Sequence, residues 1–138
     1  MTTTGGCACG QIRYEFTGEP AITALCHCTD CQKWTGGAFT SNAIIPRTAF
    51  KITKGTPKTW DVRGDTGKIN KHFFCTECGS GLWTELELMP DKTCVKAGGL
   101  DAGASSLKKK IDVEFYVRDR VSYLAAAEGA KQEHLFGQ

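Results

Sequence analysis

The chain has 138 residues, of which 41% are hydrophobic and 23% charged, and its formal net charge is +2. This length predicts one domain, residues 1–138, with a modest core. No apolar stretch approaches the roughly 20 residues of a membrane helix, and residues 1–6 lack the charged and apolar regions of a signal peptide. We therefore expect a cytoplasmic protein, cytosolic or nuclear, that does not contact membranes and keeps its thiols reduced.

One run of like charge stands out in the sequence, Lys108-Lys109-Lys110. Three lysines are typical of a solvated loop or of the lead-in to a strand. A nucleic-acid surface would need a basic stripe interleaved with exposed aromatic residues, and the sequence has none. The charge pattern therefore argues against a nucleic-acid partner.

Short β-rich runs recur along the chain, separated by glycine and proline turns. Apolar and polar residues alternate most clearly in 50–53 and 111–117, which is typical of strands with one buried face. The predicted strands are residues 11–16, 22–25, 40–45, 50–54, 58–62, 69–74, 82–87, 93–98 and 111–117. Many short strands with regular turns predict a mainly β fold.

One segment, Thr29–Thr35, has the pattern of a short helix, with Thr29 or Asp30 as its N-terminal cap. The tail from about residue 125 is predicted to form a short helix or to stay loose. The predicted fold class is therefore mainly β, built of small antiparallel sheets with one short helix.

Seven of the eight cysteines fall into three clusters. The first (Cys7, Cys9) and the third (Cys75, Cys78) both end in a cysteine followed by glycine, which permits a tight turn with N–H groups aimed at sulfur. Zinc prefers thiolate ligands in a tetrahedron, and cysteines two or three positions apart offer two sulfurs to one ion. These two pairs therefore predict one structural zinc site with four thiolates.

The second cluster, Cys26, Cys28 and Cys31, has no partner pair. Three protein ligands leave a fourth position for water, hydroxide or a substrate thiolate, as catalytic zinc sites do. The chain would then carry two zinc ions. Seven thiolates remove seven charges and two zinc ions restore four, so the formal charge becomes −1 and gives no reason to expect acidic partners.

Other uses of these cysteines compete with this interpretation. Disulfides need an oxidising compartment, and the spacing does not follow that of ferredoxin iron–sulfur clusters. The second site could also be closed by a fourth protein ligand, namely His27, His72 or Cys94, and be merely structural. An extended segment would point His27 away from Cys26 and Cys28, and His72 is expected on the surface of a strand.

Cys94 lies in a predicted strand and shares a face with the charged residues Lys92 and Lys96. Strand alternation therefore predicts that Cys94 is partly exposed or at a sheet edge, away from the metal clusters. A lone cysteine is more often a small packing residue than a ligand, and we expect this role for Cys94.

The order of the three cysteine motifs resembles that of the glutathione-dependent formaldehyde-activating enzyme family. The similarity rests on residues 5–14, 26–36 and 74–80 and covers about residues 5–124. The resemblance implies a β-tent fold of small sheets pinned by zinc. It also implies a structural zinc on Cys7, Cys9, Cys75 and Cys78 and a catalytic zinc on Cys26, Cys28 and Cys31. The implied activity is that of a carbon–sulfur lyase that forms or cleaves S-hydroxymethylglutathione.

A thiol such as glutathione would enter the open zinc position, lose its proton and attack the carbonyl carbon of formaldehyde or a related small carbonyl. Four thiolates would give the site a charge of −2, so positive charge or hydrogen-bond donors are needed nearby. Lys33 and Ser80, which each follow a cysteine cluster, are candidates for this role, although a solvated lysine and a turn serine remain alternatives.

The aromatic residues near the clusters could have either of two roles. Trp34 and Phe39 follow the open cluster and could line a pocket or belong to the core, whereas Trp83 and Phe73 are expected in the core. A different class of function also fits the sequence, namely a zinc-stabilised binding or scaffold module without catalysis. A fourth protein ligand at the second cluster would favour that module.

Overall fold

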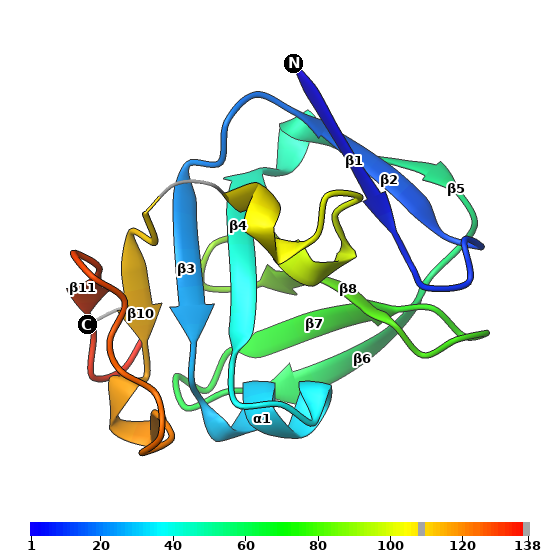
Figure 1. Ribbon diagram of the computed structural model, residues 1–138. Coiled ribbons are helices and arrows are strands. Elements are labelled where there is room, and N and C mark those ends of the chain that lie inside the picture. Colours follow the sequence, from blue (N-terminus) through cyan, green and yellow to red (C-terminus); the bar gives the residue numbers. More distant parts are fainter. Residues whose placement is uncertain (108–109, 137–138) are drawn as a thin grey trace.

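The structure, a computed structural model, describes residues 1–107 and 110–136. It consists of two sheets and, among the described residues, one α-helix, α1 (Thr29–Thr35) (Figure 1). The mainly β fold and the position of the helix are thus confirmed, but the N-terminal cap is Cys28 and not Thr29 or Asp30. Of the lysine run, Lys108 and Lys109 lie outside the described residues. No helix among the described residues is long and apolar enough to cross a membrane.

The smaller sheet has three antiparallel strands in the order β1-β2-β5. Its strands are β1 (Thr2–Gly6), β2 (Arg13–Thr17) and β5 (Phe50–Lys54). Tyr14 and Phe16 alternate with polar residues in β2 and are almost fully buried. Strand β1 was not predicted, because its run of threonine and glycine shows no apolar alternation.

The larger sheet has eight strands. In order across the sheet they are β11 (Lys131–Gln132), β10 (Val113–Phe115), β3 (Ile22–Cys26), β4 (Thr40–Pro46), β9 (Lys92–Lys96), β8 (Gly81–Leu86), β7 (Ile69–Phe74) and β6 (Lys58–Arg63). Pairing is antiparallel from β3 to β6, whereas β10 runs parallel to both β3 and β11. The 3-10 helices are η1 (Arg47–Ala49), η2 (Ala97–Gly99), η3 (Ala104–Leu107) and η4 (Val117–Asp119).

The register of this sheet sorts its side chains into two faces. Ala43 of β4 lies opposite Val95 of β9, and Val95 lies opposite Trp83 of β8. Residues directly opposite in a sheet share a face, so these three side chains point to the same side. The next residues along β4 and β9, Ile44 and Cys94, also lie opposite each other and point to the other side.

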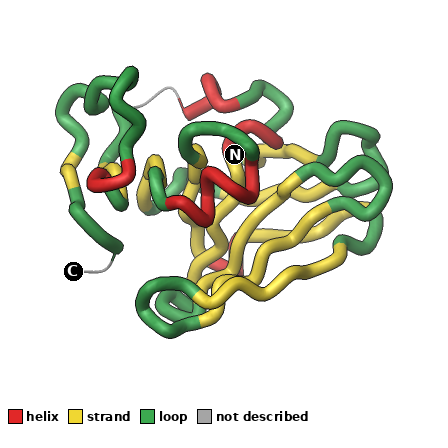
Figure 2. Tube along the Cα trace, turned by 90° about the horizontal axis from the view of Figure 1, so that it is seen from below, coloured by secondary structure: helices red, strands yellow, loops and turns green. Residues whose placement is uncertain are grey.

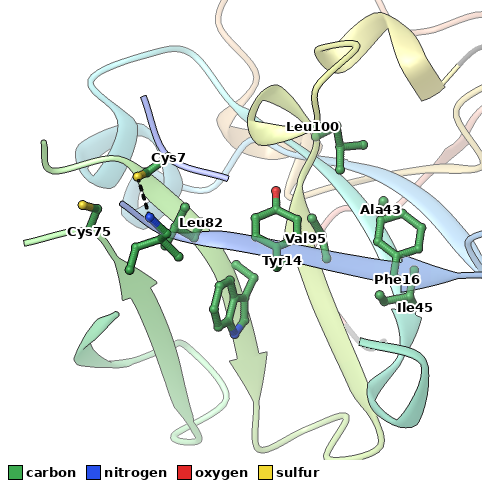
Figure 3. Close-up of a cluster of buried hydrophobic side chains, with 12 residues drawn as sticks. Cys7, Tyr14, Phe16, Ala43, Ile45, Cys75, Leu82, Val95 and Leu100 are labelled. Atoms are coloured by element: carbon green, nitrogen blue, oxygen red, sulfur yellow. Dashed lines mark hydrogen bonds between the residues drawn. The ribbon is translucent and has the colours of Figure 1, made fainter. Parts of the chain in front are cut away.

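The main core lies between the first of these faces and the smaller sheet. Trp83 is its centre, with Phe73 stacked on it at a centroid distance of 4.7 Å and Tyr14 edge-on at 5.7 Å. The expected core positions of Trp83 and Phe73 are therefore confirmed. Figure 3 shows that the buried side chains come from both sheets, among them Tyr14, Phe16, Ala43, Ile45, Leu82 and Val95, and that Leu100 joins them from the segment after η2.

The C-terminal segment is mostly loop and lies at one side of the molecule (Figure 2). It is attached through Glu114 of β10, a buried carboxylate that accepts hydrogen bonds from the N–H of Ala127 and from Nε2 of Gln132, both at 2.8 Å. The same carboxylate contacts His27 Nε2 at 2.7 Å and Arg120 Nη2 at 3.2 Å. The buried carboxylate of Glu114 thus connects β10 and the C-terminal segment to His27, which lies just before α1.

We expect Glu114→Ala to lower the free energy of unfolding by about 3–5 kcal/mol, because it leaves buried polar partners without their carboxylate. Urea denaturation measures this change, and the exposed Glu128→Ala is the matched control. Burial raises the pKa of Glu114, but the hydrogen bonds from Gln132, His27 and Ala127 together lower it by more than burial raises it. The net pKa therefore lies below its ordinary value.

A carboxylate with a depressed pKa stabilises the fold above its unfolded pKa, and this contribution is lost as the pH falls through the folded pKa. The parent should therefore lose stability below about pH 4, and part of that acid loss should be missing in Glu114→Ala. Equal stability of the two alanine variants at pH 7 would contradict this account.

Candidate functional site

Four cysteine thiols from two loops converge beside the smaller sheet. Cys7 and Cys9 lie between β1 and β2, and Cys75 and Cys78 lie between β7 and β8. The Sγ atom of Cys9 is 3.6 Å from that of Cys7 and 3.8 Å from that of Cys75. A tetrahedron of sulfurs with metal–sulfur bonds of about 2.3 Å has edges of about 3.8 Å. This four-cysteine cluster therefore could hold a metal ion, and its all-sulfur donor set suits zinc.

The two loops of this cluster have the same local geometry. The N–H of Gly10 donates to the carbonyl of Cys7 at 3.2 Å, and the N–H of Gly79 donates to that of Cys75 at 2.9 Å. Both glycines have a positive φ, 79° and 73°, which other residues adopt only with strain. The N–H of Ile12 donates to Cys7 Sγ at 3.2 Å, as the dashed line in Figure 3 marks. The turn chemistry expected from the Cys-Gly pairs is therefore present.

Ser80 ties the two loops of the four-cysteine cluster together. Its hydroxyl lies 3.1 Å from Cys78 Sγ and accepts a hydrogen bond from the N–H of Ala8 at 3.0 Å. This hydroxyl is the main reason that the pKa of Cys78 falls to about 5. Of the two candidates for charge compensation, Ser80 thus contacts the four-cysteine cluster, and the side chain of Lys33 is exposed on α1.

A second group of thiols lies where β3 meets α1. Cys26 is the last residue of β3, Cys28 caps α1, and Cys31 lies in the first turn of the helix. The Sγ atom of Cys28 accepts a hydrogen bond from the N–H of Cys31 at 3.3 Å. Contacts with the thiols of Cys26 and then Cys28 lower the pKa of Cys31 below its ordinary value, so this three-cysteine cluster favours a thiolate at this position. Such a cluster could hold a metal ion.

Within the described residues, no further cysteine, histidine or carboxylate joins the three-cysteine cluster. His27 is 1% exposed and directs Nε2 to Glu114 Oε1, so it points away from the neighbouring thiols as expected. His72 and Cys94, the two other candidates for a fourth ligand, are also outside the cluster.

A cavity of about 140 Å³ opens beside this cluster, and all three of its cysteines line the wall. The floor is the second face of the larger sheet, where the register places Thr40 opposite Cys26 and Asn42 opposite Lys96. At the mouth, Arg118 of η4 forms an ion pair of 2.8 Å with Asp65 in the turn between β6 and β7. A ligand in this cavity would therefore meet the thiols, a polar floor and a charged rim.

The prediction that His72 lies on the surface is wrong. His72 is 5% exposed and lines the cavity. A hydrogen bond of 2.7 Å joins its Nδ1 to Thr84 Oγ1. Trp34 of α1 stacks on the imidazole with a centroid distance of 4.6 Å. Burial lowers the pKa of His72 to about 4, so the ring is neutral at pH 7. The alternation pattern could not reveal that a helix covers this face of the sheet.

The prediction that Cys94 is exposed or at an edge is also wrong. Cys94 does share a face with Lys92 and Lys96, but that face is the floor of the cavity and Cys94 is 5% exposed. Strand β9 lies between β4 and β8, well inside the sheet. Burial raises the pKa of Cys94, so its thiol stays protonated beside Ile44. The two lysines suggested that this face of the strand is exposed to solvent, whereas Lys96 lines the cavity.

A second cavity, which is more open to solvent, also has Lys96 in its wall. Trp34 and Phe39 line it, together with Ser80 and Gly81. Trp34 approaches the backbone so closely that a Cβ atom at Gly81 would lie 2.7 Å from its Nε1. Both aromatic residues therefore line a cavity, and Trp34 also packs between α1 and the larger sheet.

Comparisons with known proteins agree with this arrangement. The model of the family described as "Glutathione-dependent formaldehyde-activating enzyme" matches residues 2–119. The chain belongs to this family. A curated protein of Penicillium rubens named "Putative glutathione-dependent formaldehyde-activating enzyme" is 29% identical over 83 residues, which are 59% of this chain and 42% of the relative. The chain thus matches less than half the length of that relative.

A crystal structure of a Rhodobacter sphaeroides protein has the same fold, with a TM-score of 0.61 and 19% sequence identity. The match covers 78% of this chain and 96% of that protein. The likeness supports the fold of this family member, and the family match over most of the chain confirms the resemblance carried by the three cysteine motifs.

Several side chains of the site were missed in the sequence. Thr40 and Asn42, both polar and buried on β4, line the cavity beside Thr84 and Lys96. The polar start of a strand whose second half is apolar, Thr40-Ser41-Asn42, was a signal for this face. It could not be assigned to a site without knowing which strands flank β4.

We expect the two clusters to respond differently to the loss of a ligand. Cys75→Ser should unfold the chain, because a structural zinc contributes on the order of 10 kcal/mol in small domains. Cys28→Ser should leave the β fold largely intact and release the second metal ion. Circular dichroism and elemental analysis test both outcomes, and equal loss of folding would argue that both clusters are structural.

Cys94→Ser should retain both metal ions, because Cys94 lies in the cavity floor outside both clusters. Elemental analysis of the purified variant beside the parent measures this, and the substitution is a control for Cys28→Ser. Loss of one ion from Cys94→Ser would instead make Cys94 a ligand of the three-cysteine cluster.

Proposed function

We propose that this chain is a zinc-dependent carbon–sulfur lyase that adds a thiol such as glutathione to formaldehyde or a related small carbonyl, or catalyses the reverse reaction. The observation that carries the proposal is the three-cysteine cluster, which lines a cavity and receives no fourth ligand from the described residues. Membership of the family supports the reaction class and the thiol.

In this proposal the two clusters have different tasks. Zinc on Cys7, Cys9, Cys75 and Cys78 would link the N-terminal loop to the loop after β7, a structural role. Cys26, Cys28 and Cys31 would hold the catalytic zinc. When bound there, zinc supplies the Lewis acidity that keeps an incoming thiol deprotonated at neutral pH.

The residues of the chain would then bind and orient the carbonyl compound. In the reaction the thiol loses its proton, a carbon–sulfur bond forms, and the carbonyl oxygen gains a proton to become a hydroxyl group. Tyr116, His72 and Thr84 line the cavity and are neutral at pH 7, with the pKa of Tyr116 raised to about 12 by burial. The hydroxyl of Tyr116 can donate a hydrogen bond to the carbonyl oxygen. His72 and Thr84 share a hydrogen bond that uses the proton of one of them, so the other member of this pair can donate as well.

The size of the cavity supports a small substrate. About 140 Å³ is room for the end of a thiol and for a small carbonyl compound, but not for the whole of a tripeptide. The remaining parts of glutathione would lie outside this cavity, at its charged rim or along the neighbouring surface. The proposal thus separates the reacting atoms from the part of the thiol that gives specificity.

The test measures how fast free formaldehyde and glutathione interconvert with their adduct. Exchange NMR with ¹³C-labelled formaldehyde gives this rate. The parent protein with two zinc ions should accelerate exchange, and Cys28→Ser should reduce it to the uncatalysed rate while its circular dichroism stays unchanged. Parent protein that carries two zinc ions but leaves the exchange rate of several thiols and aldehydes unaltered would refute the enzyme and favour a scaffold module.

A further inference from the structure

A line of hydrogen bonds crosses the cavity floor from β9 to the three-cysteine cluster. Lys96 Nζ lies 2.8 Å from Asn42 Oδ1, Asn42 Nδ2 lies 3.0 Å from Thr40 Oγ1, and Thr40 Oγ1 lies 3.3 Å from Cys31 Sγ. We propose that through this relay the positive charge of Lys96 stabilises the Cys31 thiolate, and that Lys96 is a positioning residue of the metal centre.

The sheet register builds the relay. Asn42 of β4 lies directly opposite Lys96 of β9, and Thr40 is two residues before Asn42, so all three side chains share the cavity face. Thr40 is 4% exposed and Asn42 is 5% exposed. Burying polar side chains in a central strand costs free energy unless they are hydrogen-bonded, and the relay satisfies them.

The hydrogen bonds of the relay all run in one direction. The Nδ2 group of Asn42 also faces the carbonyl oxygens of Ala24 at 3.3 Å and of Thr40 at 3.2 Å, so its Oδ1 must be the atom that faces Lys96. The Thr40 hydroxyl accepts from Asn42, which leaves its own hydrogen to donate to Cys31 Sγ. Each donor therefore points toward the sulfur, the polarity that stabilises a thiolate.

Lys96 is the cation best placed for this task. In the described part of the chain its ammonium group forms no ion pair, and its one hydrogen bond is to a neutral amide. Arg118, the other cation on the cavity wall, is already paired with Asp65 and lies 3.6 Å from Asp119. Lys33, expected from the sequence, is exposed on α1.

A zinc ion with three thiolates carries a formal charge of −1, and a substrate thiolate would make it −2. Positive charge delivered through Thr40 would favour both the cluster and the entry of the fourth thiolate. The inference rests on the proposed function where it takes a thiol as the incoming ligand, but its effect on metal affinity does not depend on turnover.

The experiment measures Co²⁺ and Zn²⁺ affinity of the three-cysteine cluster by chelator competition, with the cobalt–thiolate absorption band as the signal. Lys96→Met and Thr40→Val should each weaken metal binding about tenfold, the scale of one lost charge-assisted hydrogen bond. Lys96→Arg and Thr40→Ser should retain affinity near that of the parent. Lys92→Met is the matched control, since Lys92 lies on the same face of β9 but pairs with Asp91 at the surface.

The double variant decides between a relay and two separate effects. If Lys96 acts through Thr40, Lys96→Met combined with Thr40→Val should weaken metal binding no more than either change alone. Multiplied losses, or an affinity of Lys96→Met equal to that of Lys92→Met, would overturn the relay. Circular dichroism and the metal content of the four-cysteine cluster show that each variant is folded.

The same variants separate this inference from the proposed function. Adding glutathione to the cobalt-loaded parent should shift the absorption band, and Lys96→Met should need about tenfold more thiol for the same shift. A parent whose metal affinity depends on Lys96 but which never catalyses exchange would refute the lyase and leave the relay intact. If the parent catalyses exchange but its metal affinity does not change in Lys96→Met, the relay is refuted and the lyase stands.

Discussion

The two-sided register of the larger sheet is the constraint on which the rest of the structure depends. In β4, β9 and β8 one set of alternate residues packs against the smaller sheet around Trp83, and the other set forms the cavity floor. A slip of one residue would exchange the two sets, bringing Lys96 and Asn42 into the core and Val95 into the cavity. The packing of the core therefore fixes the polar floor of the site, and the stability of the fold and the geometry of the cavity cannot vary independently.

The two cysteine clusters act on this frame in different ways. The four-cysteine cluster joins loops that are 66 residues apart in the chain, so a metal ion there would restrain the unfolded chain and hold β1 against the larger sheet. The three-cysteine cluster is local, since Cys26, Cys28 and Cys31 lie within one turn of the junction between β3 and α1. Its loss would remove little long-range restraint. The difference in loop length is the physical reason to expect one cluster to serve the fold and the other to serve the cavity.

Much of this could be predicted from the sequence, because local patterns carry it. Cysteine spacing identified both clusters, alternation with turn residues identified nine strands, and a helix-start pattern identified the helix Thr29–Thr35. The errors at His72 and Cys94 share one cause, since alternation shows that two residues share a face but not what covers that face. Trp34 stacks on His72 from α1, and β10 adds Phe115 to the apolar cluster that contains Cys94. These contacts are made by segments far away in the sequence. Strand β11 has two residues, which are too few for a local pattern, and it is held by backbone hydrogen bonds to β10 and by the side chain of Glu114.

The composition of the cavity floor bears on why the site is more than a metal clamp. A clamp needs thiolates and the backbone N–H groups that face them, which the four-cysteine cluster obtains from two glycine turns and Ser80. The three-cysteine cluster has in addition a row of buried polar side chains, from His72 and Thr84 to Asn42 and Thr40, in the middle of a sheet where apolar residues would be more stable. Such a row costs stability, and its members His72 and Thr84 add nothing to the metal site itself. In the proposed function it would face a ligand that carries charge and hydrogen-bonding atoms into the cavity, namely a thiolate with a carbonyl compound.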